Sequence, residues 1–453
     1  MKPLSLRKIA EVTNGIYHGS SENLDSLITG VVRDNRDISS GNLFVCFKGE
    51  RVDGHDFAAD AYSSGAICCL AEHELSVDEP YILVSSTFSA LKLLAAYYRS
   101  LFSIPIIGIT GSVGKTTAKE MIASVLSKKY NTLKTQGNLN NEIGVPLTLL
   151  SLKAEHEVAV IEMGINTFGE MSRLAQMVRP DIFVMTNIGN SHLAFLEDKT
   201  GVLRAKSEAF EYMSKDSTVI LNGDDALLFD LNVPGEKIRY GFSNENDFHA
   251  KNISNTGSTS IQFDILSVNQ RFHASVNALG KPIVYASLAA AAVGHRLSVP
   301  EDAIIEGLSD YTTIKGRARI FDTGYITILD DCYNANPNSM IAAIESLCSL
   351  PGRRVAILGD MGELGDQESD FHREIGYVAS RHPLDLLLCC GTLSKFIYDT
   401  AISNKNLSVW YFPDKDELFC VLPSLILKSD TVLVKASNSM KFSEIVDELE
   451  KLA

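Results

Sequence analysis

The chain has 453 residues, of which 45% are apolar and 21% charged, a composition typical of globular proteins with sizeable cores. At about 150 residues per domain, this length predicts three domains and excludes a long disordered protein. Lys and Arg number 41 against 56 Asp and Glu, so the formal net charge is −15. Because we find no dense basic cluster, a chain this acidic is not expected to bind nucleic acid.

The cysteines and the apolar runs indicate the cellular compartment in which the protein is expected. The eight cysteines form no CxxC pair, which argues against a zinc site or a disulfide framework. We find no signal-peptide pattern at the N-terminus and no apolar run near the ~20 residues that cross a bilayer. We therefore expect a cytoplasmic protein with reduced cysteines and no membrane contact.

The first block, residues 1–84, predicts a small α/β domain. Short β-like runs are separated by polar turns, and they lie at 43–47, 66–71 and 81–84. A helical pattern of apolar residues at 87–100 leads into the next block.

The second block, residues 85–313, alternates short apolar strands with helical patterns. The strand candidates are 104–110, 158–163, 182–188 and 219–222. Helical stretches between such strands are typical of a mostly parallel sheet. The more polar stretch 248–277 alternates in places and predicts an antiparallel addition to that sheet.

The third block, residues 314–453, repeats the strand–helix alternation. Its strand candidates are 326–329, 355–358, 386–389, 409–412 and 432–434. This pattern predicts a second doubly wound, Rossmann-like domain, so the expected fold is α/β with three domains.

The segment 104–128 is the most informative in the chain. An apolar strand leads into a Gly-containing loop and then a helix; the loop is Thr110, Gly111, Ser112, Val113, Gly114, Lys115, Thr116 and Thr117. Such a loop cradles phosphates with its amides, while the Lys reaches the terminal phosphates and a Thr hydroxyl ligates magnesium. Ile109 stands where the strict P-loop pattern has Gly, so an ordinary strand-to-helix turn is the alternative. We expect ATP as the ligand.

Two residues near the carboxyl ends of the next strands suggest a metal site. Glu162 closes one strand, and His192 follows the next. In a parallel sheet these ends meet at the edge that carries the phosphate loop, where a carboxylate can hold Mg²⁺. A salt-bridging or helix-capping Glu162 is an equal alternative, and a lone histidine such as His192 is more often structural.

Lys206 falls in the apolar stripe of a helix predicted from 200 to 213. Burial lowers the pKa of a lysine and leaves a neutral amine that can take up carbon dioxide as a carbamate, an oxygen ligand for magnesium. From periodicity alone, a lysine with its stem on apolar surface and its ammonium in water is favoured.

Several separated motifs together resemble the Mur ligases, ATP-dependent amide-forming enzymes of peptidoglycan synthesis. The resemblance spans nearly the whole chain and rests on VVRDNRDISSGNLFVCFKGERVDGHDF in the first block, on TGSVGKTT, TQGNLNNEIGVPLTLL, EMG, TNIGNSHL and LRAKSEAF in the second, and on DDCYNANPNSM, LGDMGELG and DTVLVKAS in the third.

The resemblance implies a role for each matching residue. Lys115, Lys206, His192 and Arg317 match catalytic positions, and Thr116, Glu162, His192 and carbamylated Lys206 match metal ligands. The loop 110–117 matches the nucleotide site together with Asn187, Arg317, Asp331, Tyr333, Asn334 and Asn336. Substrate-facing positions are matched by Asn35, Arg36, Asp53, His55, Asn138, Asn140, Asn141, Lys435 and Ser437.

The resemblance also implies a reaction. The DDCYNANPNSM segment favours ligation of D-alanyl-D-alanine to UDP-N-acetylmuramoyl-tripeptide, with ATP and Mg²⁺ as cofactors and an acyl phosphate as intermediate. The first domain would bind the UDP-sugar, and the chain would be a monomer that supports cell-wall synthesis and cell division. The alternatives are a related amide ligase with another acceptor and a nucleotide-binding homologue without ligase activity.

The chain departs from the family's pattern at a few positions. Pro282 and Ala286 replace a His and an Asn in a segment that contacts adenine in relatives. Ala436 and Asn438 stand where relatives have Gly and Arg, and Asn35 replaces a Ser.

Overall fold

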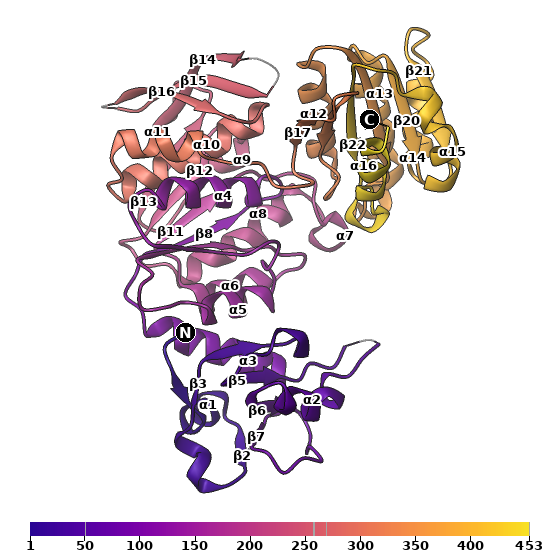
Figure 1. The fold of residues 1–453 in the computed structure, drawn as a ribbon. Helices are drawn as coiled ribbons and strands as arrows, with labels where there is room; N and C mark the ends of the chain where they lie inside the picture. The colour runs from indigo at the N-terminus through magenta and orange to yellow at the C-terminus, as the bar shows by residue number, and fades with distance from the viewer. Residues whose placement is uncertain (50, 257–258, 269, 453) are drawn as a thin grey trace.

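The computed structural model describes residues 1–49, 51–256, 259–268 and 270–452. Glu50 of the first-block motif and three residues of the 248–277 stretch lie outside this description. Three α/β bodies follow one another along the chain, and the central body lies between the N-terminal and C-terminal ones (Figure 1). The predicted class, α/β with three domains, is confirmed.

The N-terminal body is built on a sheet with strand order β2-β7-β6-β5-β4, in which only β2 is antiparallel to its neighbour. These strands are β2 (Ile16–His18), β4 (Gly30–Val32), β5 (Asn42–Val45), β6 (Ala66–Ala71) and β7 (Tyr81–Leu83), and β1 (Leu4–Ser5) pairs separately with β3 (Leu27–Ile28). The helices are α1 (Leu6–Thr13), α2 (Ala58–Ser63) and α3 (Thr87–Ser100), with 3-10 turns at Ser21–Asp25, Asn35–Asp37 and Gly54–Phe57. Helix α3 has the predicted bounds and begins where the Ser86 hydroxyl accepts a hydrogen bond from the Ser89 amide.

The central body has a sheet in the order β16-β15-β14-β13-β12-β11-β8-β10-β9. From β9 to β14 neighbouring strands are parallel, and β14, β15 and β16 form the predicted antiparallel addition. The strands are β8 (Ile106–Thr110), β9 (Thr132–Lys134), β10 (Val158–Glu162), β11 (Ile182–Met185), β12 (Thr218–Asn222), β13 (Glu236–Gly241), β14 (Phe248–Thr256), β15 (Ser260–Leu266) and β16 (Arg271–Val276).

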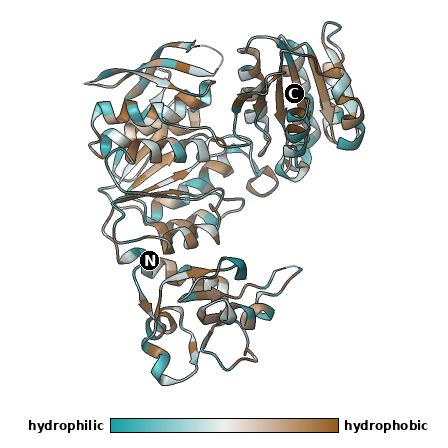
Figure 2. Cartoon of the chain, viewed as in Figure 1, coloured by the Kyte–Doolittle hydropathy of each residue, from teal (hydrophilic) through white to brown (hydrophobic). Residues whose placement is uncertain are grey.

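Helices cover both faces of this sheet. They are α4 (Lys115–Leu126), α5 (Gly144–Leu150), α6 (Glu170–Val178), α7 (Leu193–Leu196), α8 (Lys199–Ser207), α9 (Ala226–Phe229), α10 (Lys281–Arg296) and α11 (Glu301–Ser309). Alternate residues of β10 face opposite cores: Val160 packs with α4 and α10, whereas Ile161 packs with α3 and α6. Strands β8, β10, β11 and β12 are buried along their whole length, and they are accordingly almost wholly apolar (Figure 2). Strand β14 differs, since most of its residues are exposed.

Two predicted elements of the central body end earlier than expected. The helix predicted to reach 213 stops at Ser207 and continues as a 3-10 turn, Glu208–Tyr212, because the Glu208 carboxylate accepts hydrogen bonds from Gly169 and Ser172 at the start of α6. The strand predicted to reach 188 stops at Met185, since the next side chains bond to the phosphate loop.

The C-terminal body has a sheet in the order β17-β18-β22-β19-β20-β21, parallel except for β17. The strands are β17 (Arg319–Asp322), β18 (Thr327–Asp330), β19 (Arg353–Gly359), β20 (Leu386–Cys390), β21 (Ser408–Phe412) and β22 (Asp430–Lys435). The helices are α12 (Pro337–Cys348), α13 (Glu368–Arg381), α14 (Ser394–Ala401), α15 (Lys415–Leu425) and α16 (Ser443–Glu450), with 3-10 turns at Gly365–Gln367 and Asn438–Met440. None of the helices in the described part of the chain is long and apolar enough to cross a bilayer.

Helix α11 approaches α4 closely at a glycine, and this contact can be tested. An added Cβ at Gly307 would lie 2.5 Å from the Cα of Val125, a backbone atom that cannot move aside. We expect Gly307→Ala to lower the free energy of unfolding by about 1–3 kcal/mol through overpacking, although alanine is favoured over glycine by about 1 kcal/mol in a helix. Urea unfolding measures the change. The exposed neighbour Ser309→Ala should change stability by less than about 0.5 kcal/mol, and a stabilised Gly307→Ala would contradict the packing argument.

Candidate active site

A cavity of about 540 Å³ lies between the central and C-terminal bodies, at the carboxyl ends of the central strands. Most of the predicted residues of these two bodies line it: Ser112, Val113, Gly114, Lys115, Thr116, Thr117, Asn140, Asn141, Glu162, His192, Arg317, Asp331, Tyr333, Asn334, Asn336, Lys435 and Ser437. Thr110, Gly111, Asn138, Asn187 and Lys206 are not among the described residues that line it. The tertiary structure therefore brings together side chains that are more than 300 residues apart.

The phosphate loop packs against the two residues that follow β11, Thr186 and Asn187. Gly111 (φ +149°) lies so close to β11 that an added Cβ would lie 1.9 Å from the Thr186 hydroxyl oxygen. The Asn187 side chain accepts from the Val113 amide at 2.9 Å and donates to the Val113 carbonyl at 3.1 Å. Asn187 thus supports the loop backbone from outside the cavity. Helix α4 begins at Lys115 without a capping side chain in the described residues, so its first amides remain available for an anion.

Lys115 reaches back over this loop, and its ammonium donates to the Gly111 carbonyl at 2.7 Å. Burial lowers the pKa of Lys115, and the positive charge of Arg317 lowers it further, while the Glu162 carboxylate opposes both. Two cations from different bodies therefore line the same cavity, close enough for each charge to disfavour the other. Their mutual repulsion would be relieved by a bound polyanion such as a triphosphate.

Glu162 is a buried carboxylate at the end of β10, as the strand pattern predicted. Its Oε1 atom accepts hydrogen bonds from the Thr116 hydroxyl at 3.1 Å and from the side-chain amide of Asn140 at 2.8 Å. Its Oε2 atom is buried and accepts no hydrogen bond within the described ranges. A buried carboxylate oxygen without a hydrogen-bond donor, beside a Thr hydroxyl, fits a hard divalent cation such as Mg²⁺.

His192 connects the two bodies that form the cavity. Its Nδ1 atom lies 2.6 Å from Oε2 of Glu363, and this contact lowers the pKa of the Glu363 carboxyl. The Asn190 amide donates to Oδ1 of Asn338 at 3.2 Å in the same region. The structure therefore pairs His192 with a carboxylate of the C-terminal body.

Lys206 on α8 is 1% exposed, and it makes no hydrogen bond or ion pair among the described residues. Burial lowers the pKa of Lys206 well below its usual value, and the nearby charge of Lys115 lowers it further. The ammonium is therefore not in water, contrary to the alternative that periodicity favoured. A neutral, nucleophilic amine is the form that the surroundings stabilise.

The C-terminal side of the cavity is held by a second buried lysine. Lys435 donates to Oδ2 of Asp331 at 2.6 Å and to the Asn334 carbonyl at 2.9 Å. The Asn336 side chain caps α12 by accepting from the Ser339 amide. The Arg317 guanidinium stacks on the ring of Tyr333, with its central carbon 3.6 Å from the ring centroid. The sequence-predicted residues here thus bond to one another as well as forming the cavity wall.

The loop before α5 contains the three predicted asparagines. The Asn141 side chain accepts from the amides of Ile143 and Gly144 at 3.1 and 2.9 Å and so starts α5. Asn140 binds Glu162, as described above, and Asn138 is exposed. Each asparagine therefore has a different environment.

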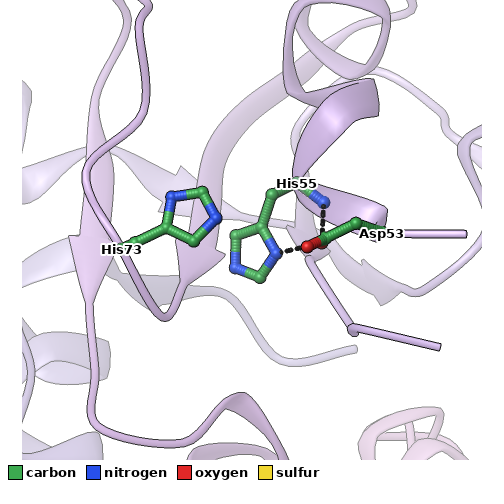
Figure 3. A group of neighbouring side chains, drawn as sticks. All are labelled: Asp53, His55 and His73. Atoms are coloured by element: carbon green, nitrogen blue, oxygen red, sulfur yellow. Dashed lines mark hydrogen bonds and ion pairs between the residues drawn. The ribbon is translucent and has the colours of Figure 1, made fainter. Parts of the chain in front are cut away.

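The predicted residues of the N-terminal body lie outside this cavity. Asn35 begins a 3-10 turn, and the exposed Arg36 pairs with Asp34 at 2.6 Å. Asp53, His55 and His73 form a cluster in which the two imidazole rings stack with centroids 4.2 Å apart (Figure 3). His55 Nδ1 lies 2.5 Å from Asp53, and its Nε2 accepts from the Glu72 amide at 2.9 Å. Because both ring nitrogens of His55 are engaged, the cluster is not suited to a metal ion.

Sequence reasoning missed Lys119, Glu363 and Asn338. Lys119 lies on α4 and is fully buried. It is spaced three and seven residues from the buried Ile122 and Leu126, so the periodicity that singled out Lys206 contained the same signal for Lys119. Glu363 and Asn338 contact the central body only through tertiary structure, and no local pattern indicates that.

Three family models match the chain. They are described as "Mur ligase family, catalytic domain" (residues 27–99), "Mur ligase middle domain" (109–294) and "Mur ligase, glutamate ligase domain" (316–438). The UDP-N-acetylmuramoyl-tripeptide–D-alanyl-D-alanine ligase of Bacillus subtilis is 36% identical, with 98% of each chain covered. The ligase of the same name from Escherichia coli is also 36% identical, with 100% of this chain and 99% of the relative covered.

The fold of the chain is also similar to solved structures of MurF ligases. The crystal structure of MurF from Acinetobacter baumannii superposes with a TM-score of 0.92 at 30% identity, and covers 100% of this chain and 99% of that one. MurF ligase from Thermotoga maritima in complex with ADP superposes with a TM-score of 0.83 at 27% identity, and covers 93% of this chain and 97% of that one.

The burial of Lys206 predicts a pH-dependent stability. Because the folded-state pKa is lowered, the unfolded chain binds more protons between that pKa and the ordinary value near 10.5, and stability rises with pH in this window. In buffer freed of carbon dioxide, we expect Lys206→Met to be more stable than the parent at pH 7 by about 1–4 kcal/mol. The gain should shrink as the pH approaches 10.

Urea unfolding at several pH values between 7 and 10 measures this effect. Lys199→Met, an exposed position at the start of the same helix, serves as the matched control and should show no such trend. A stability gain for Lys206→Met that stays constant with pH would mean that Lys206 is not held neutral.

Proposed function

The chain belongs to the Mur ligase family of ATP-dependent ligases, and on that premise we propose that it joins D-alanyl-D-alanine to UDP-N-acetylmuramoyl-tripeptide. The product would be UDP-N-acetylmuramoyl-pentapeptide, with ADP and phosphate released. The observation that carries the proposal is the convergence of the phosphate loop, Glu162 and Arg317 on one cavity between two bodies. The relatives named for this reaction match over nearly their whole length.

We propose that each of the three bodies binds a different substrate. Residues 1–84 would bind the UDP-sugar, with Asn35, Arg36, Asp53 and His55 near it. Residues 85–313 would bind ATP on the phosphate loop, and residues 314–453 would bind the incoming dipeptide near Lys435 and Ser437. Asn138, Asn140 and Asn141 would face the peptide substrate. The location of the ATP cavity between the second and third bodies supports this arrangement.

The reaction requires activation of a carboxylate, because its oxygen is a poor leaving group. An oxygen of the tripeptide's terminal carboxylate attacks the γ-phosphorus of ATP, the bond to ADP breaks, and an acyl phosphate forms. The amine of D-alanyl-D-alanine then attacks the acyl carbon, and the tetrahedral intermediate loses a proton and expels phosphate. Lys115 and Arg317, which line the cavity from different bodies, would stabilise the charge on the transferred phosphoryl group.

Mg²⁺ is part of the proposal. It would be held by Oε2 of Glu162, by Thr116 and by His192. Lys206 would be a further ligand, once its neutral amine has added carbon dioxide to give a carbamate. When bound, Mg²⁺ would neutralise phosphate charge and orient the γ-phosphoryl group. The buried Oε2 of Glu162, which accepts no hydrogen bond within the described ranges, and the lowered pKa of the buried Lys206 support this assignment. Asn187, Asp331, Tyr333, Asn334 and Asn336 would complete the nucleotide site.

The proposed product is a nucleotide-linked precursor of peptidoglycan. We accordingly propose a cytoplasmic enzyme, active as a monomer, that supports cell-wall synthesis, cell shape and division. Its use of ATP and a UDP-sugar, and the free cysteines in the described residues, support a reducing intracellular compartment.

The reaction can be tested directly by phosphate release. With ATP, Mg²⁺ and UDP-N-acetylmuramoyl-tripeptide, we expect release to depend on added D-alanyl-D-alanine and to accompany formation of the pentapeptide, detected by mass spectrometry. Phosphate release of equal rate without the dipeptide would rule out the ligase, and release only with a different amine would indicate another acceptor.

The carbamate can be tested separately at Lys206. Lys206→Ala should lose at least about 100-fold in kcat because an interaction at the reacting phosphoryl group is lost. Added short carboxylates such as acetate should restore part of the rate by supplying the missing oxygen ligand. Lys199→Ala is the control and should be unaffected by acetate. Full activity of Lys206→Ala without acetate would contradict the carbamate.

A further inference from the structure

A fully buried lysine lies one helical turn beyond the phosphate loop. Lys119 follows Lys115 by four residues on α4, and its side chain is 0% exposed. An ammonium removed from water is costly unless its donors are paired. The partners of Lys119 therefore indicate what the residue is for.

Those partners are the loop after β9 and a neighbouring carboxylate. The ammonium donates to the Thr135 carbonyl at 2.8 Å and to the Gly137 carbonyl at 3.2 Å. It also pairs with Oε1 of Glu120 at 2.8 Å, and Glu120 pairs in turn with Lys134. Lys119 thus attaches the helix of the phosphate loop to the start of the loop that contains Asn140.

The same loop positions Glu162 from two directions. The Thr135 hydroxyl accepts a hydrogen bond from the Glu162 amide at 3.0 Å. Three residues beyond Gly137, the side-chain amide of Asn140 donates to Oε1 of Glu162 at 2.8 Å. Lys119 itself lies 3.9 Å from Oε2, the oxygen that accepts no hydrogen bond within the described ranges. A closed ring of contacts therefore runs from α4 through the loop to the end of β10 and back to α4.

We propose that Lys119 is a positioning residue, which sets the Glu162 carboxylate for the metal–nucleotide complex through Thr135 and the 135–141 loop. This inference rests on the proposed function, because it assumes that Glu162 receives a divalent cation with the nucleotide. Lys119 is not among the described residues that line the cavity, so it would contact neither nucleotide nor substrate. Its effect must therefore appear in metal-dependent binding rather than in nucleotide binding as such.

The decisive measurement is the affinity for ADP with Mn²⁺ and with EDTA, by calorimetry. We expect Lys119→Met to weaken ADP binding at least tenfold with Mn²⁺ and less than threefold in EDTA. An equal loss in both conditions would mean a merely structural role and would overturn the proposal. Unchanged or tighter binding with Mn²⁺ would also overturn it, because Lys119 would then only repel the metal.

Two further variants sharpen the test. Lys134→Met removes the other partner of Glu120 and leaves the ring intact, so it should bind like the parent in both conditions. Thr135→Val removes only the hydroxyl that accepts from the Glu162 amide, and it should reproduce the Mn²⁺-specific loss at three- to tenfold. If Lys119→Met does not fold, Thr135→Val decides, and parental Mn²⁺-dependent affinity in that variant would overturn the proposal.

Hydrogen exchange separates this proposal from the proposed function. Without metal or nucleotide, the amides of residues 135–141 should exchange at least tenfold faster in Lys119→Met than in the parent, and unchanged exchange would overturn the proposal. If the parent protein gains no ADP affinity from Mn²⁺, the proposed metal site fails, whereas the exchange result still decides whether Lys119 holds the loop.

Discussion

The buried carboxylate of Glu162 is the constraint on which the central body of this ligase depends. A charge at the end of a parallel strand, removed from water, must be matched by donors and cations from the surrounding elements. Thr116 comes from the phosphate-loop helix, Asn140 from the loop before α5, and Lys119 approaches the second oxygen. These requirements bring three separate segments to one point, next to the loop that can cradle phosphates.

The C-terminal body contributes positively charged side chains to the cavity. Arg317 stacks on Tyr333, while Lys435 is bound by Asp331 and the Asn334 carbonyl. His192 and Glu363 join the two bodies across the cavity. A protein with a net charge of −15 can accept polyanionic ligands in this way, because the cations that matter are gathered locally and held by short contacts.

Much of the fold was predictable from local pattern. Helix α3 begins and ends where its apolar spacing predicts, and β10 ends at Glu162 as the run VAVIE predicts. The errors arose where tertiary contacts overrode propensity: Glu208 leaves its helix to cap α6, and the residues after Met185 bond to the phosphate loop. Strands β13 and β17 were not predicted, because charged residues interrupt their apolar pattern: β13 reads EKIRYG and β17 reads RIFD.

The sequence by itself determined the three α/β domains, the phosphate loop and the list of residues that resemble a Mur ligase site, because periodicity and motif spacing are local properties. Only the tertiary structure decided which of these residues meet. It placed Asn187 against the phosphate loop, gave both ring nitrogens of His55 a partner, and buried the side chains of Lys206 and Lys119. Burial and pairing depend on segments distant in the chain, and for that reason no local pattern could establish them.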